Sequence, residues 1–151
     1  MPKYAIDTNV YIDSLGDPAK AEALKSFIYS HLAETFLSAV VVQELRVGAR
    51  NPTAAATLEA DVFAPFERRG RVVAPSPAAF KECGRVLVNL INKEGLAYAD
   101  TRRALVSDVL IATSCREHGI VLITNDRDFD MIRRHVKGWR AIAPWPRSKS
   151  R

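Results

Sequence analysis

The sequence predicts an α/β protein, a three-layer α/β/α sandwich with a mainly parallel sheet. Short apolar runs rich in β-branched residues recur along the chain, and longer segments with apolar residues at helical spacing separate them. Strands that alternate with helices form βαβ units, which build a parallel sheet covered by helices. No internal repeat, low-complexity block or linker interrupts the pattern. We therefore expect one domain over residues 1–144 and a basic, flexible tail over 145–151.

The first half of the chain contains two predicted strands and three predicted helices. Residues 3–7 (KYAID) form the first strand, and residues 35–37 form a second, brief one. Helices are predicted over "AKAEALKSFIYSHLA", "VVVQELRVGAR" and "TAAATLEADVFAPFERR". The last of these is expected to bend or end near Pro65. Asp17-Pro18 and Ser38 mark helix starts, and Asn51-Pro52 interrupts the second of these helices.

The second half continues the alternation of strands and helices. "GRVVAPSP" is a short strand between turns, and "AAFKECGRVLVNLINKEG" is a helix that closes at Gly95. "LAYADTRRAL" is either a short helix or an ordered loop. Ser107 is the expected N-cap of the helix "DVLIATSCREHG", which precedes the strand "IVLIT". "NDRDFDMIRRH" is a final short helix and "RAIA" a last strand.

Composition and length fit an ordinary globular domain. The chain has 151 residues, 48% apolar and 26% charged, so it can bury roughly 70% of its unfolded surface. No apolar stretch approaches the roughly 20 residues that span a bilayer, and no signal peptide is recognisable, so we expect a cytoplasmic protein without a membrane partner. Cys83 and Cys115 lack ligand spacing and are expected to be buried, reduced thiols.

The positive charge is concentrated at the C-terminal end. The formal net charge is +5, but the chain before the last 21 residues carries 15 basic and 17 acidic groups. Such a basic end favours a polyanionic partner, because neutralising phosphates releases counterions, although a solubilising tail is an equal alternative. Seven residues carry this charge: Arg133, Arg134, Lys137, Arg140, Arg147, Lys149 and Arg151.

Four acidic residues lie just after predicted strands or on the helices that neighbour them in the chain. Asp7 ends the first strand, Asp126 follows "IVLIT", Asp108 lies in the first turn of the helix before it, and Glu44 lies on the helix after the second strand. In open α/β sheets the ligand site forms outside the carboxyl ends of the strands. Taken singly, each acid could instead cap a helix or form a turn, lie where the dipole of a helix stabilises a negative charge, or face water. As a set, they predict one acidic cleft.

Gathered carboxylates repel one another, so without a partner some would take up protons. A cation removes this conflict, and oxygen ligands without a nearby Cys or His cluster favour Mg²⁺ or Mn²⁺. One or two such ions can lower the pKa of a bound water and stabilise charge on a phosphodiester. Three histidines lie near helix ends and are interpreted as favoured by the helix dipole or solvated rather than catalytic: His31, His118 and His135.

The motifs "IDTNV", "VVVQELRVG", "SDVLIA" and "LITNDRDF" occur in an order that resembles the PIN-domain nucleases, and most closely the VapC-type toxins of toxin–antitoxin pairs. The resemblance covers Tyr4 to about Pro144. It implies an α/β/α sandwich, a Mg²⁺- or Mn²⁺-dependent ribonuclease site, homodimerisation and inhibition by a small VapB-type antitoxin.

By position, the family's four acids correspond to Asp7, Glu44, Asp108 and Asp126. Thr124 matches the hydroxyl residue that precedes the fourth acid, where it can hydrogen-bond near Asp7. Asn9 resembles the polar residue beside the first acid. Asp128 is the alternative to Asp126 if the preceding strand ends later.

Arginines near the predicted site could steer RNA phosphates, since the guanidinium fork matches phosphate oxygens. The alternative for each is to pair with a carboxylate or to face water. These arginines are Arg46, Arg102, Arg103 and Arg127. Trp139 and Trp145 could stack on bases, but are better interpreted as anchors of the core or of a dimer contact.

The leading hypothesis is a metal-dependent endoribonuclease that acts as the toxin of a type II toxin–antitoxin system. An RNA-processing nuclease without an antitoxin keeps the same chemistry, and the fold does not separate the two. A third hypothesis is an RNA- or partner-binding module that has lost catalysis, but no acid of the quartet is missing.

Overall fold

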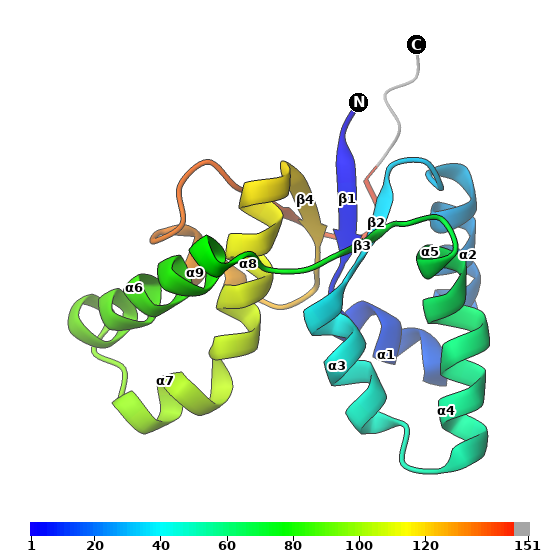
Figure 1. Ribbon diagram of the computed structural model, residues 1–151, viewed down its shortest axis with the longest axis horizontal. Coiled ribbons are helices and arrows are strands. Elements are labelled where there is room, and N and C mark those ends of the chain that lie inside the picture. Colours follow the sequence, from blue (N-terminus) through cyan, green and yellow to red (C-terminus); the bar gives the residue numbers. More distant parts are fainter. Residues whose placement is uncertain (147–151) are drawn as a thin grey trace.

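The computed structural model describes residues 1–146, which form a five-stranded parallel sheet flanked by helices (Figure 1). The strand order is β3-β2-β1-β4-β5, and every neighbouring pair is parallel. The predicted α/β/α sandwich is confirmed. The strands are β1 (Lys3–Ile6), β2 (Thr35–Ser38), β3 (Val72–Val73), β4 (Ile120–Ile123) and β5 (Ala141–Ile142).

Two groups of helices cover the sheet. In Figure 1, α6 to α9 lie on one side of the strands, and α1, α2, α4 and α5 lie on the other. The helices are α1 (Thr8–Gly16), α2 (Pro18–Ser30), α3 (Ala39–Gly48), α4 (Pro52–Leu58), the π-helix η1 (Glu59–Phe63), α5 (Ala64–Glu67), α6 (Pro77–Glu94), α7 (Tyr98–Ala104), α8 (Val106–His118) and α9 (Asp128–Arg133).

Several helix boundaries follow from the predicted capping residues. The Asp17 carboxylate accepts hydrogen bonds from the first amides of α2, at 2.9 and 3.2 Å. The Ser38 hydroxyl accepts one from the first turn of α3. Asn51, predicted only to interrupt a helix, also caps α4 by accepting a hydrogen bond from the Ala54 amide. Gly95 ends α6 with φ of 70°, a backbone conformation that residues with a Cβ rarely adopt. Local capping interactions therefore determine where these helices begin and end.

The predicted N-cap at Ser107 is wrong. Helix α8 begins at Val106, the N-cap position is Leu105, and no side chain caps this end. The reason is that α7 leads directly into α8: the Leu105 amide donates to the Thr101 carbonyl, and the Leu105 carbonyl accepts from Val109. Leu105 is also buried in the core. The ambiguous segment "LAYADTRRAL" is thus helical as α7.

One further element differs from the sequence prediction, and another agrees with it but contains an unexpected π turn. The chain after Asp7 forms α1, for which no helix is predicted. The helix expected to bend or end near Pro65 passes through the π turn of η1 first and ends two residues beyond the proline, at Glu67. Because Pro65 has no amide hydrogen, a change of helical hydrogen bonding just before it is expected.

The core lies between the sheet and its helices. All four residues of β4 are buried, as expected for a central parallel strand covered on both faces. Trp139 is 8% exposed and contacts Phe129, with ring centroids 5.9 Å apart, which confirms its role as a core anchor. Cys83 and Cys115 are buried free thiols, as predicted.

The chain's C-terminal end and its surface complete the description. Trp145 stacks on Phe27 at a centroid distance of 4.9 Å. The rest of the predicted flexible tail, residues 147–151, lies outside the described residues. Within residues 1–146 no helix is both long and apolar enough to cross a membrane.

The strand order reverses at β1. The chain first adds β2 and β3 on one side of β1 and then returns to place β4 and β5 on the other. A ligand site in an open α/β sheet forms at such a switch point, outside the carboxyl ends of the strands. Here that position is marked by Asp7 after β1 and by Thr124 after β4.

Candidate metal centre

Asp7 is held at the carboxyl end of β1 by two hydrogen bonds. One carboxylate oxygen accepts from the Thr8 amide at 2.8 Å and thereby caps α1. The other accepts from the Thr124 hydroxyl at 2.7 Å, across the β1–β4 switch point. Asp7 is only 2% exposed. Its carboxylate therefore has a fixed position and little access to bulk water.

Glu44 joins this group through Thr8. The Thr8 hydroxyl donates to Glu44 Oε1 at 2.8 Å, so one residue contacts both Asp7 and Glu44. Glu44 lies on α3, which follows β2, and is partly buried. The end of β1 and the helix after β2 are therefore joined by a direct polar contact.

Asp108 lies in the first turn of α8, next to the loop that follows β4. Carboxylate oxygens of Asp108, Asp126 and Asp128 all lie within 4.8 Å of one another. The loop is fixed by local hydrogen bonds: the Asp126 amide donates to the Thr124 hydroxyl at 3.0 Å, and the Asp128 amide donates to Asp126 Oδ1 at 2.8 Å. The structure thus places both candidates for the fourth acid beside Asp108.

Burial and the close packing of these acids raise the pKa values of Asp7 and Asp108. Burial raises the pKa of Asp7 to about 6, and the charges of Glu44 and Asp126 add to the rise, although hydrogen bonds from Thr124 and Thr8 oppose it. Burial also raises the pKa of Asp108 to about 8, with contributions from the neighbouring negative charges. These charges belong to Asp7, Asp126, Glu44 and Asp128.

No cation of the described chain neutralises the group. Every ion pair found within residues 1–146 involves Glu82, Glu94 or Glu117, and none involves the five acids described above. A buried carboxylate without a positive partner either takes up a proton or binds a metal ion. The cluster therefore has the donor set and the unbalanced charge of a divalent-cation site.

Comparison with known proteins identifies the fold. The family model described as "PIN domain" matches residues 4–134. The chain belongs to the PIN-domain family. PIN domains are nucleases, which supports a hydrolase acting on nucleic acids, and the acidic cluster lies at the switch point of this PIN domain. Among curated protein sequences, none matches this chain significantly.

Solved structures include three similar chains. A DNA-bound VapBC from Salmonella typhimurium superposes with a TM-score of 0.69 at 24% identity, covering 95% of this chain and 98% of that chain. FitAcB from Neisseria gonorrhoeae gives 0.64 at 21%, with 92% and 96% covered. VapBC2 from Rickettsia felis, bound to a promoter DNA fragment, gives 0.62 at 15%, with 93% and 97% covered. At these identities the likeness establishes the shared fold.

The PIN domain brings together all four predicted acids, together with Thr124 and Asp128. Asn9 is different: it is exposed on α1, and in the described part of the chain its side chain forms no hydrogen bond. The three histidines contact other groups, since His31 stacks on Phe27, His118 bonds the Ser114 carbonyl and His135 pairs with Glu94.

The four predicted RNA-contacting arginines are all exposed. Arg46 donates to the Ala49 carbonyl, and Arg102 contacts the Tyr98 hydroxyl and ring. Among the described residues none of the four forms an ion pair with a carboxylate. The alternative of pairing with the acids is thereby removed, while solvent exposure remains compatible with both other interpretations.

Sequence reasoning missed Thr8. Its amide and hydroxyl together hold Asp7 and Glu44, but the sequence predicts no role for it. The available signal was an aspartate followed by a threonine at a strand end, a pair that can cap a helix and bridge to a second group. Without α1 among the predicted elements, this signal had no helix to cap.

Proposed function

We propose that this PIN domain is a Mg²⁺- or Mn²⁺-dependent endoribonuclease. The observation that carries the proposal is the cluster of five carboxylates, three of them with raised pKa values, that lacks a cationic partner within residues 1–146. Retaining such a cluster costs folding free energy unless a ligand neutralises it. A divalent cation with oxygen preference fits the donors.

Asp7, Glu44, Asp108 and Asp126 would hold one or two ions, and Asp128 extends the set at its exposed end. When bound, Mg²⁺ or Mn²⁺ lowers the pKa of a coordinated water and stabilises negative charge at the phosphodiester. The chain itself positions the ligands. Thr124 fixes the orientation of Asp7, and Thr8 ties Asp7 to Glu44.

This edge offers no free hydroxyl nucleophile among the residues that contact the acids. The Thr8 and Thr124 hydroxyls each donate their proton to a carboxylate. A threonine acting as a nucleophile would need a base to accept that proton, and the carboxylates here are needed as ligands. Hydrolysis by water is therefore the chemistry that the residues support.

RNA is the proposed substrate, with exposed arginines binding its phosphates. Arg102 and Arg103 lie on α7, which leads directly into the helix of Asp108, and Arg127 lies between Asp126 and Asp128. Arg46 is two residues from Glu44 on α3. These positions place positive charge on several elements that also carry the acids, which suits a polyanion approaching an acidic site.

We further propose that the protein acts as a toxin in the cytoplasm, forms a homodimer and is inhibited by a small VapB-type antitoxin. The likeness to VapBC structures over nearly the whole chain supports this proposal. Induced expression should arrest growth, and co-expression of a neighbouring small gene should relieve the arrest. Growth arrest that persists in the Asp108→Asn variant would contradict nuclease-based toxicity.

Incubating single-stranded RNA with the purified protein and Mn²⁺, with and without a chelator, tests the nuclease directly. Cleavage should require the metal and should stop in the chelator. Asp61→Asn is a matched control, because Asp61 is an exposed acid on η1, away from the cluster. Equal cleavage with and without chelator would remove the metal from the mechanism, and its complete absence would remove the nuclease.

A further inference from the structure

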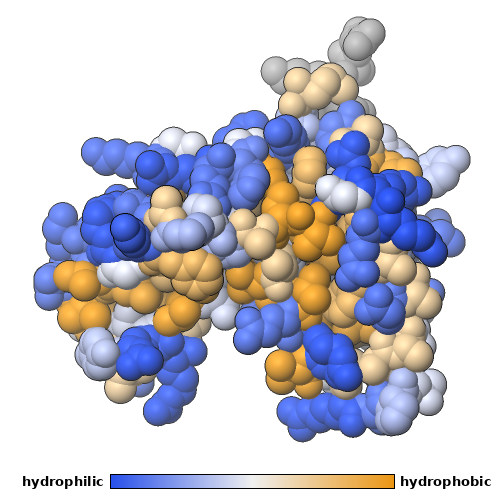
Figure 2. Space-filling view, in the orientation of Figure 1, coloured by the Kyte–Doolittle hydropathy of each residue, from blue (hydrophilic) through white to orange (hydrophobic). Residues whose placement is uncertain are grey.

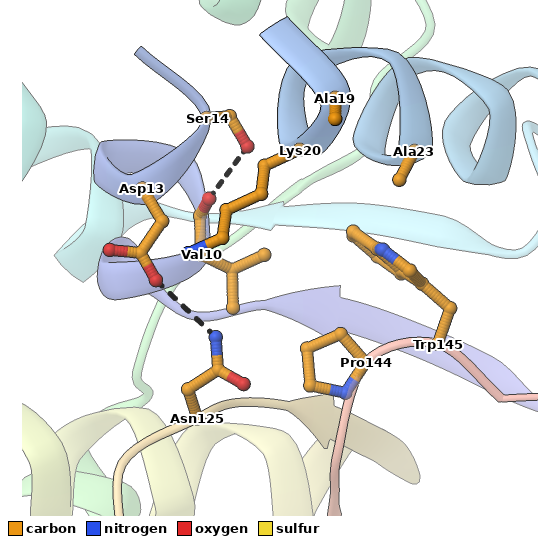
Figure 3. Close-up of a pocket in the computed structure, with 9 residues that line it drawn as sticks. All are labelled: Val10, Asp13, Ser14, Ala19, Lys20, Ala23, Asn125, Pro144 and Trp145. Carbon is orange, nitrogen blue, oxygen red and sulfur yellow. Dashed lines mark hydrogen bonds between the residues drawn. The ribbon is translucent and has the colours of Figure 1, made fainter. Parts of the chain in front are cut away.

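A cavity of about 330 Å³ opens beside the acidic cluster, on the α1–α2 side of the sheet (Figure 3). Its size lies at the lower end of the roughly 300–1,000 Å³ typical of small-molecule sites. It is formed by α1, α2, the loop after β4 and the segment at residues 144–145. None of the acids of the candidate metal centre lines it.

One side of the cavity is apolar and contains an aromatic ring. Trp145 and Pro144 form this wall, and Val10 and Ala23 face it from α1 and α2 (Figure 3). Phe27 supports the indole by stacking against it at 4.9 Å. A flat aromatic group could therefore enter between a braced indole and small aliphatic side chains, which is how single-stranded bases are held by proteins.

The other side carries polar groups with unused hydrogen-bonding capacity. Asn125 donates to one carboxylate oxygen of Asp13 through a long bond of 3.4 Å. Within the described chain, the other Asp13 oxygen and the Asn125 carbonyl accept no side-chain hydrogen bond, and Lys20 forms no ion pair. The Lys20 side chain extends from α2 across to α1 in Figure 3. An acceptor, an amide and a cation thus meet at one edge.

Two of the residues that line the cavity adjoin the candidate metal centre. Asn125 stands between Thr124, which bonds Asp7, and Asp126. Val10 donates its amide to the Asp7 carbonyl at 3.1 Å. A nucleotide whose phosphate lies at the acids could therefore place its base, or the neighbouring base, in this cavity.

We propose that the cavity binds an unpaired guanine of the RNA strand, next to the phosphodiester that is cleaved. The inference rests on the proposed ribonuclease function and adds a base preference to it. Guanine presents two adjacent donors, N1–H and the N2 amine, beside the O6 acceptor. Asp13 matches the donors, and Lys20 or the Asn125 amide matches O6. Adenine has no carbonyl, and uracil and cytosine each present a single donor group on this edge.

Binding of short single-stranded RNA without metal tests the proposal while the RNA stays intact. Two RNAs differ only at one position, which carries either guanine or an abasic ribose, and affinity is measured by fluorescence anisotropy. Repulsion from the acidic cluster acts on both RNAs and cancels in the ratio. We expect the wild type to prefer guanine by about tenfold, the discrimination of one good bidentate contact.

Variants locate the preference. Asp13→Ala and Lys20→Ala should each reduce the guanine-to-abasic affinity ratio at least about fivefold. Both residues are exposed on helices, so alanine should preserve the fold. Asp61→Ala and Lys25→Ala are matched controls, since Lys25 lies on α2 but does not line the cavity. A wild-type ratio near one, or equal ratios in all four variants, overturns the proposal.

A cleavage assay with Mn²⁺ separates this inference from the proposed function. Mapping the cut sites in a mixed-sequence RNA should give products that flank guanine, with the preference lost in Asp13→Ala. Cleavage without base preference would overturn the guanine pocket and leave the nuclease intact. Preferential guanine binding without any cleavage would support the pocket and contradict the nuclease.

Discussion

Two groups of acidic residues in this protein have opposite electrostatic surroundings. In the candidate metal centre, burial and neighbouring carboxylates raise the pKa values of Asp7 and Asp108. On α6, hydrogen bonds from Arg134 and His135 lower the pKa of Glu94. Hydrogen bonds from Arg85 likewise lower that of Glu82 on the same helix. The carboxylates on α6 are thus neutralised by arginine and histidine side chains of the protein, whereas those of the candidate metal centre have no cationic partner within residues 1–146.

This difference indicates which acids are structural and which await a ligand. The Arg134 guanidinium reaches both carboxylate oxygens of Glu94, at 3.0 and 3.1 Å. Figure 2 shows hydrophilic residues over much of the visible surface, with hydrophobic residues between them. In the candidate metal centre, Asp7 and Asp108 have neither full exposure to water nor a cationic partner within residues 1–146, so gathering the acids costs stability, which agrees with the proposed ligand-binding role.

The largest expected effect is the loss of RNA cleavage when one carboxylate of the candidate metal centre is neutralised by substitution. Asp108→Asn keeps the shape of the side chain but replaces a proposed metal ligand by a neutral amide, and it should lower RNA cleavage by at least roughly 100-fold. Initial rates with saturating Mn²⁺ measure this. Glu94→Gln, a change of the same kind in the other region, should stay close to wild type. Similar losses in both variants would erase the distinction between the two regions.

Positioning of Asp7 by Thr124 should matter next. Thr124→Val removes the hydroxyl that donates to Asp7 and accepts from the Asp126 amide. We expect cleavage to fall roughly 10- to 100-fold, the usual effect of losing a group that orients a metal ligand. A larger Mn²⁺ requirement should accompany this fall. Thr57→Val on exposed α4 is the control, and an unaffected Thr124→Val enzyme would show that Asp7 needs no such support.

The two regions should also give opposite pH dependences of stability. A raised folded pKa means that stability is present below the unfolded value and is lost as pH rises through the folded one. The metal-free protein should therefore lose stability between about pH 4 and 8, the range of Asp7 and Asp108. The lowered pKa values of Glu82 and Glu94 act in the other direction, with stability lost as pH falls below their ordinary value of 4.5.

Asp108→Asn should flatten the upper part of this profile. At neutral pH it should stabilise the metal-free protein by about 1 kcal/mol or more, because one unit of pKa shift corresponds to about 1.4 kcal/mol. Thermal unfolding across pH, in the presence of chelator, measures both effects. Stability that rises from pH 5 to 8 in the wild type would contradict the raised pKa values.

The smallest effect is expected at the ion pair between Arg134, which follows α9, and Glu94 on α6. Arg134→Ala removes an exposed ion pair from Glu94, and the melting temperature should shift by less than about 2 °C. Cleavage should remain at the wild-type rate, since neither residue contacts the acidic cluster. A loss of cleavage in this variant would connect the two regions and require a different account.

The sequence contained enough information to place the four acids and, through the family resemblance, to anticipate the hydrogen bond from Thr124 to Asp7, but not the contacts of Thr8. Asp7 and Asp126 follow apolar strands, and the alternation of strands and helices brings strand ends to one edge. Helix α1 was missed because its segment has weak intrinsic helix propensity, and it is stabilised by burial of Val10 and Tyr11 and by the Asp7 cap. Whether Asp126 or Asp128 is the fourth ligand stays a prediction, since both lie beside Asp108.

The cavity next to the cluster could not have been predicted from local patterns. Its walls come from α1, α2, the loop at Asn125 and the segment at Trp145, which are far apart in the sequence. No periodicity or capping signal specifies how such segments meet. Their packing depends on the tertiary arrangement, here including the stacking of Trp145 on Phe27.

Calorimetric titration of the metal-free protein with Mn²⁺ at neutral pH tests the central claim most directly. Saturable binding should release protons, measured as a dependence of the heat on buffer ionisation, because Asp108 with a pKa of about 8 must lose its proton to become a ligand. Asp108→Asn should weaken the binding at least about tenfold and reduce the proton release. Mn²⁺ binding that is absent, or equal in wild type and variant, would contradict a metal centre built from these acids.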